Sequence, residues 1–399
     1  MFNYIFIQAG SVVRREADKL TIQGYQNLEV SSVPYGVTFV LDVGNSLGDG
    51  IIDHHQPGTE DQCVASMIAN SADKWIGRHL KESEEYWIVT HSSPDFDALG
   101  SVYLTEKYIR EHSLPAFAFE FADYILEVDS GRKKLNKDHI IEPFSLVLAI
   151  SENIRRDSSI MPEHKDFETL KVTFKLFDSL LNMLSEGKTI VKFDWERLSN
   201  FQEHISLINN DFAVYTEDLT KRSEIYQISL PEKRFSRFLA VDCLTTRFPQ
   251  SILWKYWARG DADHSPDYKG FIMTVAFLPS ENTRAIIAVD PTSNLTLKGL
   301  GLYLDYLEMK RCLDNAEIED IVGNKRPGFH RENPWYDGRS SMHNYTIIDT
   351  PRGGSMLSED DIMNAIFNTR IWSVVFPDRE YDELSVDEIL DYFDEDLHV

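Results

Sequence analysis

The chain has 399 residues, with 40 Lys and Arg against 65 Asp and Glu, so its formal charge at pH 7 is −25. This balance argues against a long nucleic acid as partner, because binding a polyanion usually needs a broad basic face that releases counterions. A hydrophobic content of 42% is enough to fill packed cores, which excludes a disordered chain. The length predicts two or three domains of about 100 to 200 residues each.

The cysteines and the apolar runs indicate a cytoplasmic protein. Cys63, Cys243 and Cys312 are odd in number and lie far apart, which gives neither a disulfide framework nor a zinc-ligand spacing. The apolar residues 1–7 have no basic segment before them and no small-residue cleavage site after them, so they predict a strand rather than a signal peptide. No run approaches the ~20 apolar residues of a membrane span, so no membrane partner is expected.

Residues 1–160 are predicted to form an α/β domain with a parallel or mixed sheet. Short apolar runs alternate there with helical patterns, which is typical of a sheet with crossover helices on its faces. The predicted helices are residues 64–80 and 99–111. The predicted strands are residues 4–7, 37–41, 50–52, 86–90, 116–119 and 144–150.

The remaining chain is predicted to form a helical connector, residues 161–230, and a second, smaller α/β or α+β domain, residues 231–399. Apolar residues recur at three- and four-residue steps from Phe167 to Leu184, which marks the packed face of an amphipathic helix. Residues 378–399 are strongly acidic, which is typical of a solvated tail. In the second domain, the predicted strands are residues 238–241, 270–277, 284–289, 344–348 and 372–376, and the predicted helices are 295–313 and 359–368.

Acidic and histidine residues follow three of the predicted strands directly. Ligands bind at the carboxyl ends of the strands in open α/β sheets, so polar residues gathered there point to a site. A single Asp at a strand end is more often a turn or helix cap, and Asp97 alone would suit a cap of the helix near Ala98. Their joint occurrence at three strand ends favours a functional site. The residues are Asp42, then Asp53, His54 and His55, then His91, Asp95 and Asp97.

Carboxylates and imidazoles without thiolates are the ligands of Mn²⁺, Mg²⁺ or Fe²⁺ rather than of a structural zinc ion. The number of ligands favours two ions over one. Two ions ~3.5 to 4 Å apart can hold phosphoryl oxygens and lower the pKa of a bound water. The sequence therefore predicts a two-metal hydrolytic site.

These residues resemble the motifs of the DHH phosphoesterases. The run from His91 to Ser101, His-Ser-Ser-Pro-Asp-Phe-Asp-Ala-Leu-Gly-Ser, resembles the family's H-x-N-P-D-G-D-A-x-G-S motif, Ile52-Asp-His-His55 resembles its name-giving motif, and Asp42 in Leu-Asp-Val-Gly is similar to its aspartate motif. The family includes oligoribonucleases of the nanoRNase type, phosphatases of 3′-phosphoadenosine 5′-phosphate, cyclic dinucleotide phosphodiesterases, single-strand exonucleases and manganese pyrophosphatases. A nanoRNase-like member associated with type III CRISPR loci degrades the signal nucleotide made from S-adenosylmethionine and ATP.

The resemblance covers residues 37–131 and implies two divalent metal ions, with Mn²⁺ expected and Mg²⁺ or Fe²⁺ as alternatives. It implies catalytic roles for His55, beside the substrate phosphate, and for Asp53, which would orient the histidines. The implied metal ligands are His91 and Asp95 at one ion, Asp97 and His54 at the other, Asp42 bridging both, and Asp129 as the last ligand.

The chain departs from the family pattern in two ways. The Asp-His-His motif precedes the His91 motif, the reverse of the usual order, so a rearranged or circularly permuted sheet is expected. Phe96 stands where the family usually has Gly, which bears on the freedom of that loop.

A polar stretch of the second domain is the candidate substrate-binding region. Arginine side chains match phosphate oxygens bidentately, aromatic rings stack on nucleobases, and a double glycine allows close approach of the backbone to a ligand. The alternative is a surface loop with ordinary turn residues. The candidates are Arg326, His330, Arg331, Trp335, Tyr336, Arg339, Arg352, Gly353 and Gly354.

Together these features predict a two-metal phosphodiesterase of the nanoRNase-like DHH type. Its expected partner is a small nucleotide, namely a nanoRNA, a phosphonucleoside or a nucleotide second messenger such as the S-adenosylmethionine–AMP conjugate. Alternatives are a phosphomonoesterase or pyrophosphatase with the same metals, and a non-catalytic sensor of a metal–nucleotide complex. A homodimer is left open.

Overall fold

The computed structural model describes residues 1–399 apart from 9–10, 17, 24–29, 45, 49, 56–58, 60, 136, 138–139, 191–194, 234–236, 268, 316–334, 337, 339–344, 352–353, 374–392 and 394–399. The chain divides into two compact units. Unit 1 comprises Met1–Lys133 and Lys137–Phe212, and unit 2 comprises Lys134–Asn136 and Ala213–Val399. The division falls within the predicted connector, residues 161–230.

The main sheet of unit 1 has the strand order β1-β8-β5-β7-β6. The first four strands of that order run parallel to their neighbours, and β6 runs antiparallel to β7. The predicted parallel or mixed sheet is therefore confirmed as a mixed one. The strands are β1 (Phe2–Ile7), β5 (Thr38–Leu41), β6 (Leu47–Gly48), β7 (Ile51–Ile52) and β8 (Tyr86–His91).

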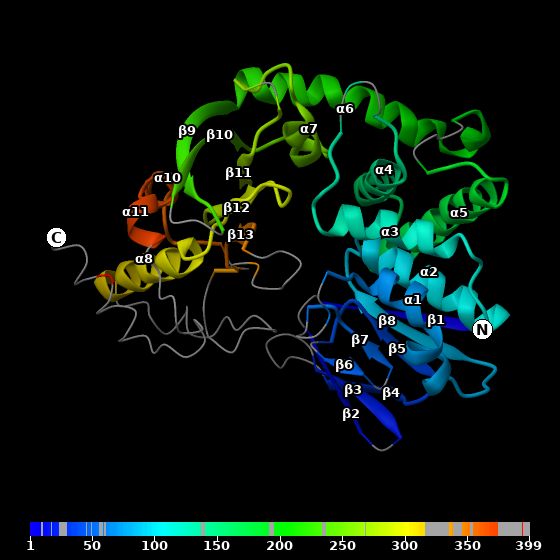
Figure 1. Ribbon diagram of the computed structural model, residues 1–399. Coiled ribbons are helices and arrows are strands. Elements are labelled where there is room, and N and C mark those ends of the chain that lie inside the picture. Colours follow the sequence, from blue (N-terminus) through cyan, green and yellow to red (C-terminus); the bar gives the residue numbers. More distant parts are fainter. Residues whose placement is uncertain are drawn as a thin grey trace. The chain divides into compact units, whose positions relative to one another are not determined.

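Helices cover one face of this sheet, and a small antiparallel sheet of β2, β3 and β4 covers the other (Figure 1). Val13, Leu20 and Ile22 of the small sheet pack against Val40 and Val89 of the main sheet. The small sheet comprises β2 (Val12–Arg15), β3 (Lys19–Gln23) and β4 (Val30–Pro34). The α-helices of unit 1 are α1 (Val64–Trp75), α2 (Phe96–Glu111), α3 (Ala118–Asp129), α4 (Pro143–Arg156) and α5 (Lys165–Ser185), with short 3₁₀ helices η2 (Gly77–His79), η3 (Pro162–His164) and η4 (Trp195–Phe201). The chain passes from unit 1 to unit 2 within α6 (Gln202–Lys221).

Two strands predicted in the first domain are wrong. Residues 144–150 lie in α4, which has Pro143 at its start and arginines in its last turn. The side chains of this helix are buried around most of its circumference, so the apolar run lacks the polar positions that distinguish a surface helix from a buried strand. Residues 116–119 lead into the first turn of α3, in which Ala118 is buried and Phe119 is exposed, so these residues do not pair in a sheet.

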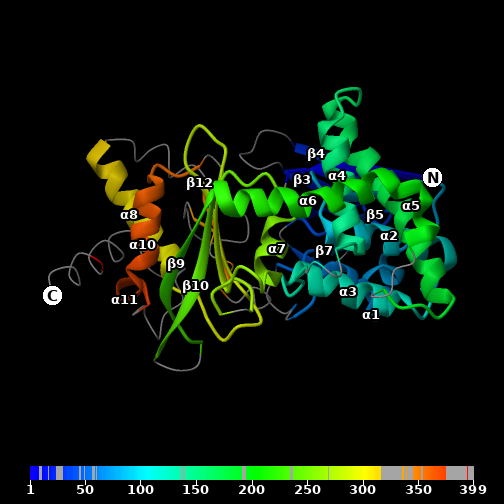
Figure 2. The same ribbon diagram turned by 90° about the horizontal axis from the view of Figure 1, so that it is seen from above.

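Unit 2 contains a mixed sheet with the order β13-β12-β11-β10-β9, in which only β10 and β11 run parallel among the described strands. Figures 1 and 2 show α8, α10 and α11 on one side of this sheet and α7 on the other. The strands are β9 (Ser223–Pro231), β10 (Phe238–Arg247), β11 (Met273–Leu278), β12 (Arg284–Val289) and β13 (Ile347–Asp349). The helices are α7 (Trp254–Gly260), α8 (Leu300–Asn315), α10 (Glu359–Phe367) and α11 (Thr369–Trp372).

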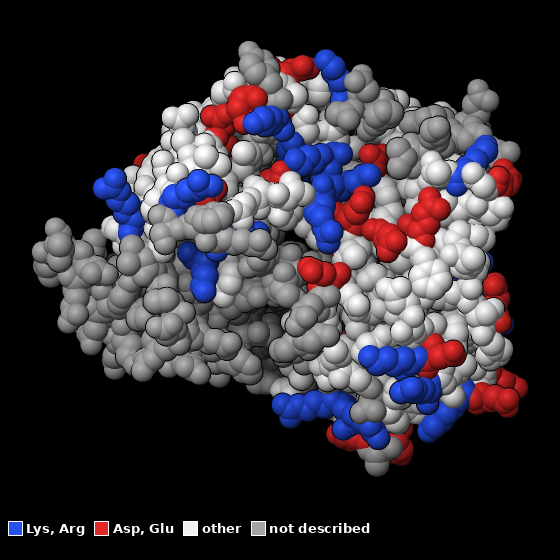
Figure 3. Space-filling view, viewed as in Figure 1, with Lys and Arg blue, Asp and Glu red and all other residues white. Residues whose placement is uncertain are grey.

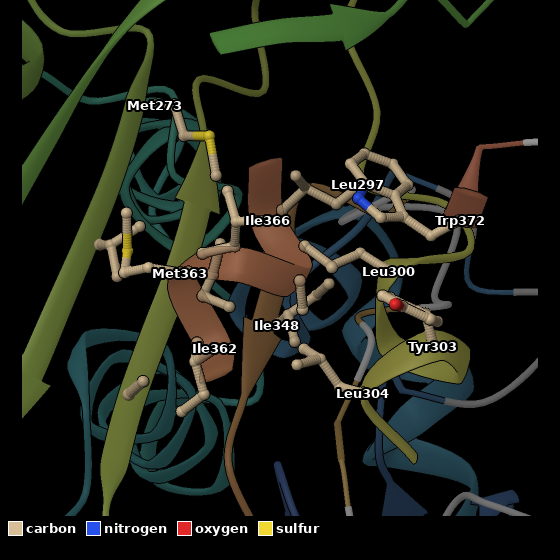
Figure 4. Close-up of a cluster of buried hydrophobic side chains, with 14 of the residues drawn as sticks. Met273, Leu297, Leu300, Tyr303, Leu304, Ile348, Ile362, Met363, Ile366 and Trp372 are labelled. Carbon is tan, nitrogen blue, oxygen red and sulfur yellow. The ribbon is translucent and has the colours of Figure 1, made fainter. Parts of the chain in front are cut away.

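The core of unit 2 lies between the sheet and the helices α8, α10 and α11. Figure 4 shows Met273 of β11 and Ile348 of β13 on the sheet side, with Ile366 of α10 and Leu300 of α8 facing them. Trp372 was predicted to begin a strand and instead ends α11, where its ring is fully buried; residues 374–376 of that predicted strand lie outside the described residues. No described helix is long and apolar enough to span a membrane.

Candidate metal centre

The three strands that end in polar residues are immediate neighbours in the sheet of unit 1. Asp42 follows β5, Asp53 follows β7, and His91 is the last residue of β8. The strands run parallel in the order β8-β5-β7, so their carboxyl ends meet at one edge. The sheet therefore brings together three segments that are separated by up to about fifty residues in the sequence.

Asp42 occupies the middle of this edge and faces a histidine with each of its oxygens. Its Oδ1 lies 3.1 Å from Nε2 of His54, and its Oδ2 lies 3.5 Å from Nε2 of His91. The backbone of Asp42 has a φ of 58°, in the left-handed region that Asp tolerates better than most residues. One carboxylate thus connects two imidazoles, which is the geometry of a bridging ligand.

Backbone carbonyls fix the orientation of both imidazole rings. Nδ1 of His54 lies 3.1 Å from the Gln62 carbonyl oxygen, and Nδ1 of His91 lies 3.0 Å from that of Ser92. A carbonyl can only accept, so each Nδ1 carries a hydrogen, and a lone pair is left on Nε2 when the ring is neutral. In a neutral His54, the lone pairs of Nε2 and Asp42 Oδ1 face each other, which is unfavourable unless a cation or a proton lies between them. Both rings thus direct Nε2 toward Asp42, where each could bind a cation.

The two aspartates of the third motif have different local roles. Asp95 is the N-cap of α2, because its Oδ1 accepts hydrogen bonds of 3.0 Å from the N–H groups of Asp97 and Ala98. Asp97 points away from its own helix and accepts from Val64 N at 2.8 Å and Ala65 N at 2.9 Å, at the start of α1. The alternative that Asp97 caps α2 is therefore wrong.

Phe96 stands where the family motif has glycine, and the backbone at this position is a regular helix. It is the first residue of α2, and its buried ring packs against Phe121, Tyr124 and Phe177. The backbone at this position is helical, so no glycine conformation is needed there.

The ligand atoms form three groups in which every atom lies within 4.8 Å of the others. Asp129, the last residue of α3, completes one of them, with its Oδ2 at 3.8 Å from Nε2 of His54. The groups are Asp42, His91 and Asp95; His54, Asp97 and Asp129; and Asp42, His54 and His55. The first group contains the ligands that the family resemblance implies for one ion, and the second contains those implied for the other ion apart from Asp42, which shares the third group with His54.

The charges within the centre are not balanced by the described protein. Burial raises the pKa of Asp97 to about 7 and that of Asp129 to about 8. Burial alone would lower the pKa of His91, but its hydrogen bond with Asp42 raises it to about 10. The neighbouring histidines likewise hold the pKa of Asp42 well below its usual range, although burial opposes this. The carboxylates thus compete for too little positive charge.

The donor set fits divalent cations. Asp129 Oδ2 is buried and has no hydrogen-bond partner within the described residues, and the buried Asp42 Oδ1 faces Nε2 of His54 with no other described hydrogen-bond donor beside it. No ion pair joins Asp42, Asp97 or Asp129 to a described lysine or arginine. Buried carboxylates without such partners are costly unless a cation supplies the missing charge.

The Asp-His-His motif separates into a ligand and a more exposed imidazole. Asp53 is buried, and its Oδ1 accepts two hydrogen bonds from His55. One comes from the backbone N–H at 3.0 Å and the other from the ring Nδ1 at 2.9 Å. His55 remains 44% exposed, and its ring centre lies 4.2 Å from that of His54. Among the described contacts, Asp53 thus orients His55 at the surface of the centre.

Two further residues contribute to the centre, and sequence patterns did not indicate them. Gln62 acts through its backbone carbonyl, which any residue type supplies. Cys63, the N-cap of α1, is buried beside Asp97, and burial raises the pKa of its thiol, which therefore stays neutral. It belongs to none of the three ligand groups.

The candidate substrate residues of the second domain have mixed outcomes. Trp335 is only 2% exposed and packs in the core of unit 2, where its Nε1 donates to Glu308, so the prediction that it stacks on a base is wrong. Tyr336 is half-buried and pairs through its backbone with Asp349. Gly354 has a φ of 85°, and a Cβ there would lie 2.6 Å from Cβ of Asn282. Outside the described residues lie Arg326, His330, Arg331, Arg339, Arg352 and Gly353.

Three comparisons with known proteins gave no match. The chain matches no protein-family model, no curated protein and no solved structure. Support for a function therefore comes from the residues of the centre and their geometry.

Proposed function

We propose that this protein is a two-metal phosphodiesterase of the DHH type that hydrolyses a short nucleotide. The supporting observation is the position of Asp42, whose two oxygens face His54 and His91 at 3.1 and 3.5 Å. A three-residue ligand group lies around each of these histidines. Such an arrangement suits two divalent ions that share one carboxylate, with Mn²⁺ as the expected ion.

Hydrolysis of a phosphodiester bonds a water oxygen to phosphorus, breaks the P–O ester bond and gives a proton to the departing hydroxyl. Two bound ions would supply the charge that stabilises the phosphoryl oxygens. His55 lies at the exposed side of the centre, and Asp53 directs its ring, so Nε2 is the atom available to contact a phosphate oxygen.

A small substrate is favoured over a long strand by the charge of −25. On the face shown in Figure 3, the described Lys and Arg side chains lie in several groups with Asp and Glu side chains among them. Dinucleotides, phosphonucleosides and the S-adenosylmethionine–AMP conjugate remain within this class.

A phosphomonoesterase or pyrophosphatase is the second candidate. The aromatic residue that argued for a nucleobase, Trp335, is buried in the core of unit 2. The same metal centre would serve a phosphomonoester equally well, so the leaving group is decided by assay.

The test is hydrolysis of a substrate panel with Mn²⁺, with Mg²⁺ and with EDTA. The panel contains a diribonucleotide, 3′-phosphoadenosine 5′-phosphate, cyclic di-AMP, pyrophosphate and the S-adenosylmethionine–AMP conjugate. We expect metal-dependent cleavage of a nucleotide, abolished by Asp42→Ala, His54→Ala and Asp129→Ala. Asp123→Ala, an exposed acidic residue on the same helix as Asp129, is the matched control and should retain activity. Metal binding without turnover of any substrate would instead indicate a sensor.

A further inference from the structure

The turn between β8 and α2 carries a predicted ligand at each end, His91 before it and Asp95 after it. Within the turn, Ser93 has a φ of 54°, a left-handed conformation that residues other than glycine rarely adopt. The turn sets the separation of His91 Nε2 and Asp95 Oδ1, which is 3.9 Å. A backbone in this conformation persists only when its surroundings hold it.

One of the contacts that hold the turn comes from a distant part of unit 1. Ser92 N donates to the carbonyl of Ile7 on β1 at 2.7 Å, within the sheet edge itself. Ser93 N donates to Oδ1 of Asp166 at 3.1 Å, across 73 residues of sequence. Asp166 lies in the first turn of α5, in the region that the sequence predicted only as a connector.

The helix that carries Asp166 is fixed in the core of unit 1. Phe174 and Phe177 of α5 pack edge to face on Tyr103 of α2, with ring centres 5.1 and 5.4 Å apart. Phe177 also contacts Phe121 of α3 at 4.9 Å. The acceptor oxygen of Asp166 is therefore held by the same packed helices that support the metal centre.

We propose that Asp166 is a positioning residue for the half of the centre formed by His91 and Asp95. By accepting from Ser93 N, it holds the turn in the conformation that directs both ligands to one ion. The role depends on hydrogen-bond acceptance and not on charge, so an asparagine oxygen can replace the carboxylate. This inference rests on the metal centre of the proposed function.

The experiment measures Mn²⁺ binding to the full chain by electron paramagnetic resonance, without any substrate. Asp166→Ala is expected to lower the affinity for the ion at His91 and Asp95 about 10- to 100-fold, as the loss of a supporting hydrogen bond does in other metal sites. The affinity for the second ion should change less than about twofold, because a substitution has little effect on a site with which it shares no contacts. Asp166→Asn should restore most of the affinity.

Two controls separate positioning from a general effect on the helix. Asp166 and Glu168 are both acidic residues in the first turn of α5, where either charge favours the helix dipole. Glu168→Ala should therefore leave both Mn²⁺ affinities unchanged if Asp166 acts through Ser93. In a His91→Ala background, Asp166→Ala should have no further effect on the remaining ion.

The outcomes are distinguishable. Unchanged affinities in Asp166→Ala, equal losses at both ions, or failure of Asp166→Asn to restore binding would overturn the positioning role. If Asp166→Ala does not fold, Asp166→Asn still shows whether a hydrogen-bond acceptor without a charge supports Mn²⁺ binding. Glu168→Ala shows whether the loss of a negative charge from the first turn of α5 by itself weakens that binding. A wild-type chain that binds no Mn²⁺ would overturn the proposed function itself, and the inference with it.

Discussion

The carboxylate of Asp97 accepts a 2.8 Å hydrogen bond from the backbone N–H of Val64, the first residue of a helix that precedes it by about thirty residues in the sequence. The second oxygen of Asp97 accepts from Ala65 at 2.9 Å. The N–H groups in the first turn of a helix have no partners within the helix, and a negative charge there is stabilising. Asp97 therefore joins α1 to α2 as well as belonging to the candidate metal centre.

Asp97→Ala should lower the free energy of unfolding even without metal. It removes the acceptor of two buried N–H groups, and each such loss costs about 1–3 kcal/mol. Urea unfolding in EDTA at about pH 5, below the folded-state pKa of Asp97 of about 7, monitored by circular dichroism, measures the change without the cost of a buried charge. Asp129→Asn is the comparison, because Asp129 Oδ2 has no described hydrogen-bond partner to lose. Equal stability of wild type and Asp97→Ala would contradict the structural role of Asp97.

The bridging position of Asp42 predicts unequal effects of ligand substitutions. Asp42 belongs to the ligand groups of both His54 and His91, whereas each histidine belongs to one side. Asp42→Ala should therefore weaken the binding of both Mn²⁺ ions, whereas His91→Ala and His54→Ala should each abolish the binding of one ion. Equilibrium dialysis at a Mn²⁺ concentration that saturates the wild type gives the stoichiometry. Retention of two ions by Asp42→Ala would exclude a bridging role.

Metal binding should stabilise unit 1 against unfolding. A ligand that binds only the folded state at one hundred times its Kd adds about 2.7 kcal/mol per site. Thermal unfolding with EDTA and with excess Mn²⁺ should therefore differ by several degrees. The double variant His54→Ala, His91→Ala should show no such difference, since one imidazole is lost from each ligand group. An equal shift in that variant would place the stabilising ion elsewhere.

Without metal, stability should fall as the pH rises from about 4 to about 8. The folded-state pKa values of Asp97, about 7, and Asp129, about 8, lie above the ordinary value of 3.8, because burial disfavours the charged carboxylates. Between those limits the folded chain holds protons that the unfolded chain has released, so raising the pH favours unfolding. Urea titrations in EDTA at several pH values test this, and Asp129→Asn should flatten the dependence. A stability that rises over this range would contradict the buried carboxylate cluster.

Trp335 is predicted to contribute to stability and not to substrate binding. Its Nε1 donates to the buried carboxylate of Glu308 at 3.2 Å, and its backbone N–H donates to Asp305 at 2.9 Å. Trp335→Phe removes only the first of these bonds, which should cost about 1–3 kcal/mol. KM for the active substrate should be unchanged. A large rise in KM at unaltered stability would restore the stacking role.

Local patterns in the sequence predicted the strands and polar motifs at the centre of unit 1. The apolar runs of β5, β7 and β8 are short and are followed by polar residues, a pattern that is typical of strands. Asp42, Asp53 and His91 were therefore predicted at the ends of strands. The same kind of pattern failed for α4, because a helix that is buried on most sides has no polar period to distinguish it from a strand.

The tertiary structure decided which of these residues meet. The strand order β8-β5-β7 places Asp42 between His54 and His91. No local pattern specifies that order, since β5 ends at Leu41 and its neighbour β8 begins only at Tyr86. The hydrogen bonds from Val64 to Asp97 and from Ser93 to Asp166 join segments about 30 and 73 residues apart. Trp335 was predicted to bind a ligand because arginines and glycines lie near it in the sequence. In the structure it packs in the core of unit 2, where a large side chain fills the space between the sheet and the helices. The residue types fix which chemistry this chain can offer, whereas the packing of distant segments fixes which side chains share a site, because contact in space depends on how all the elements of a unit fill its core.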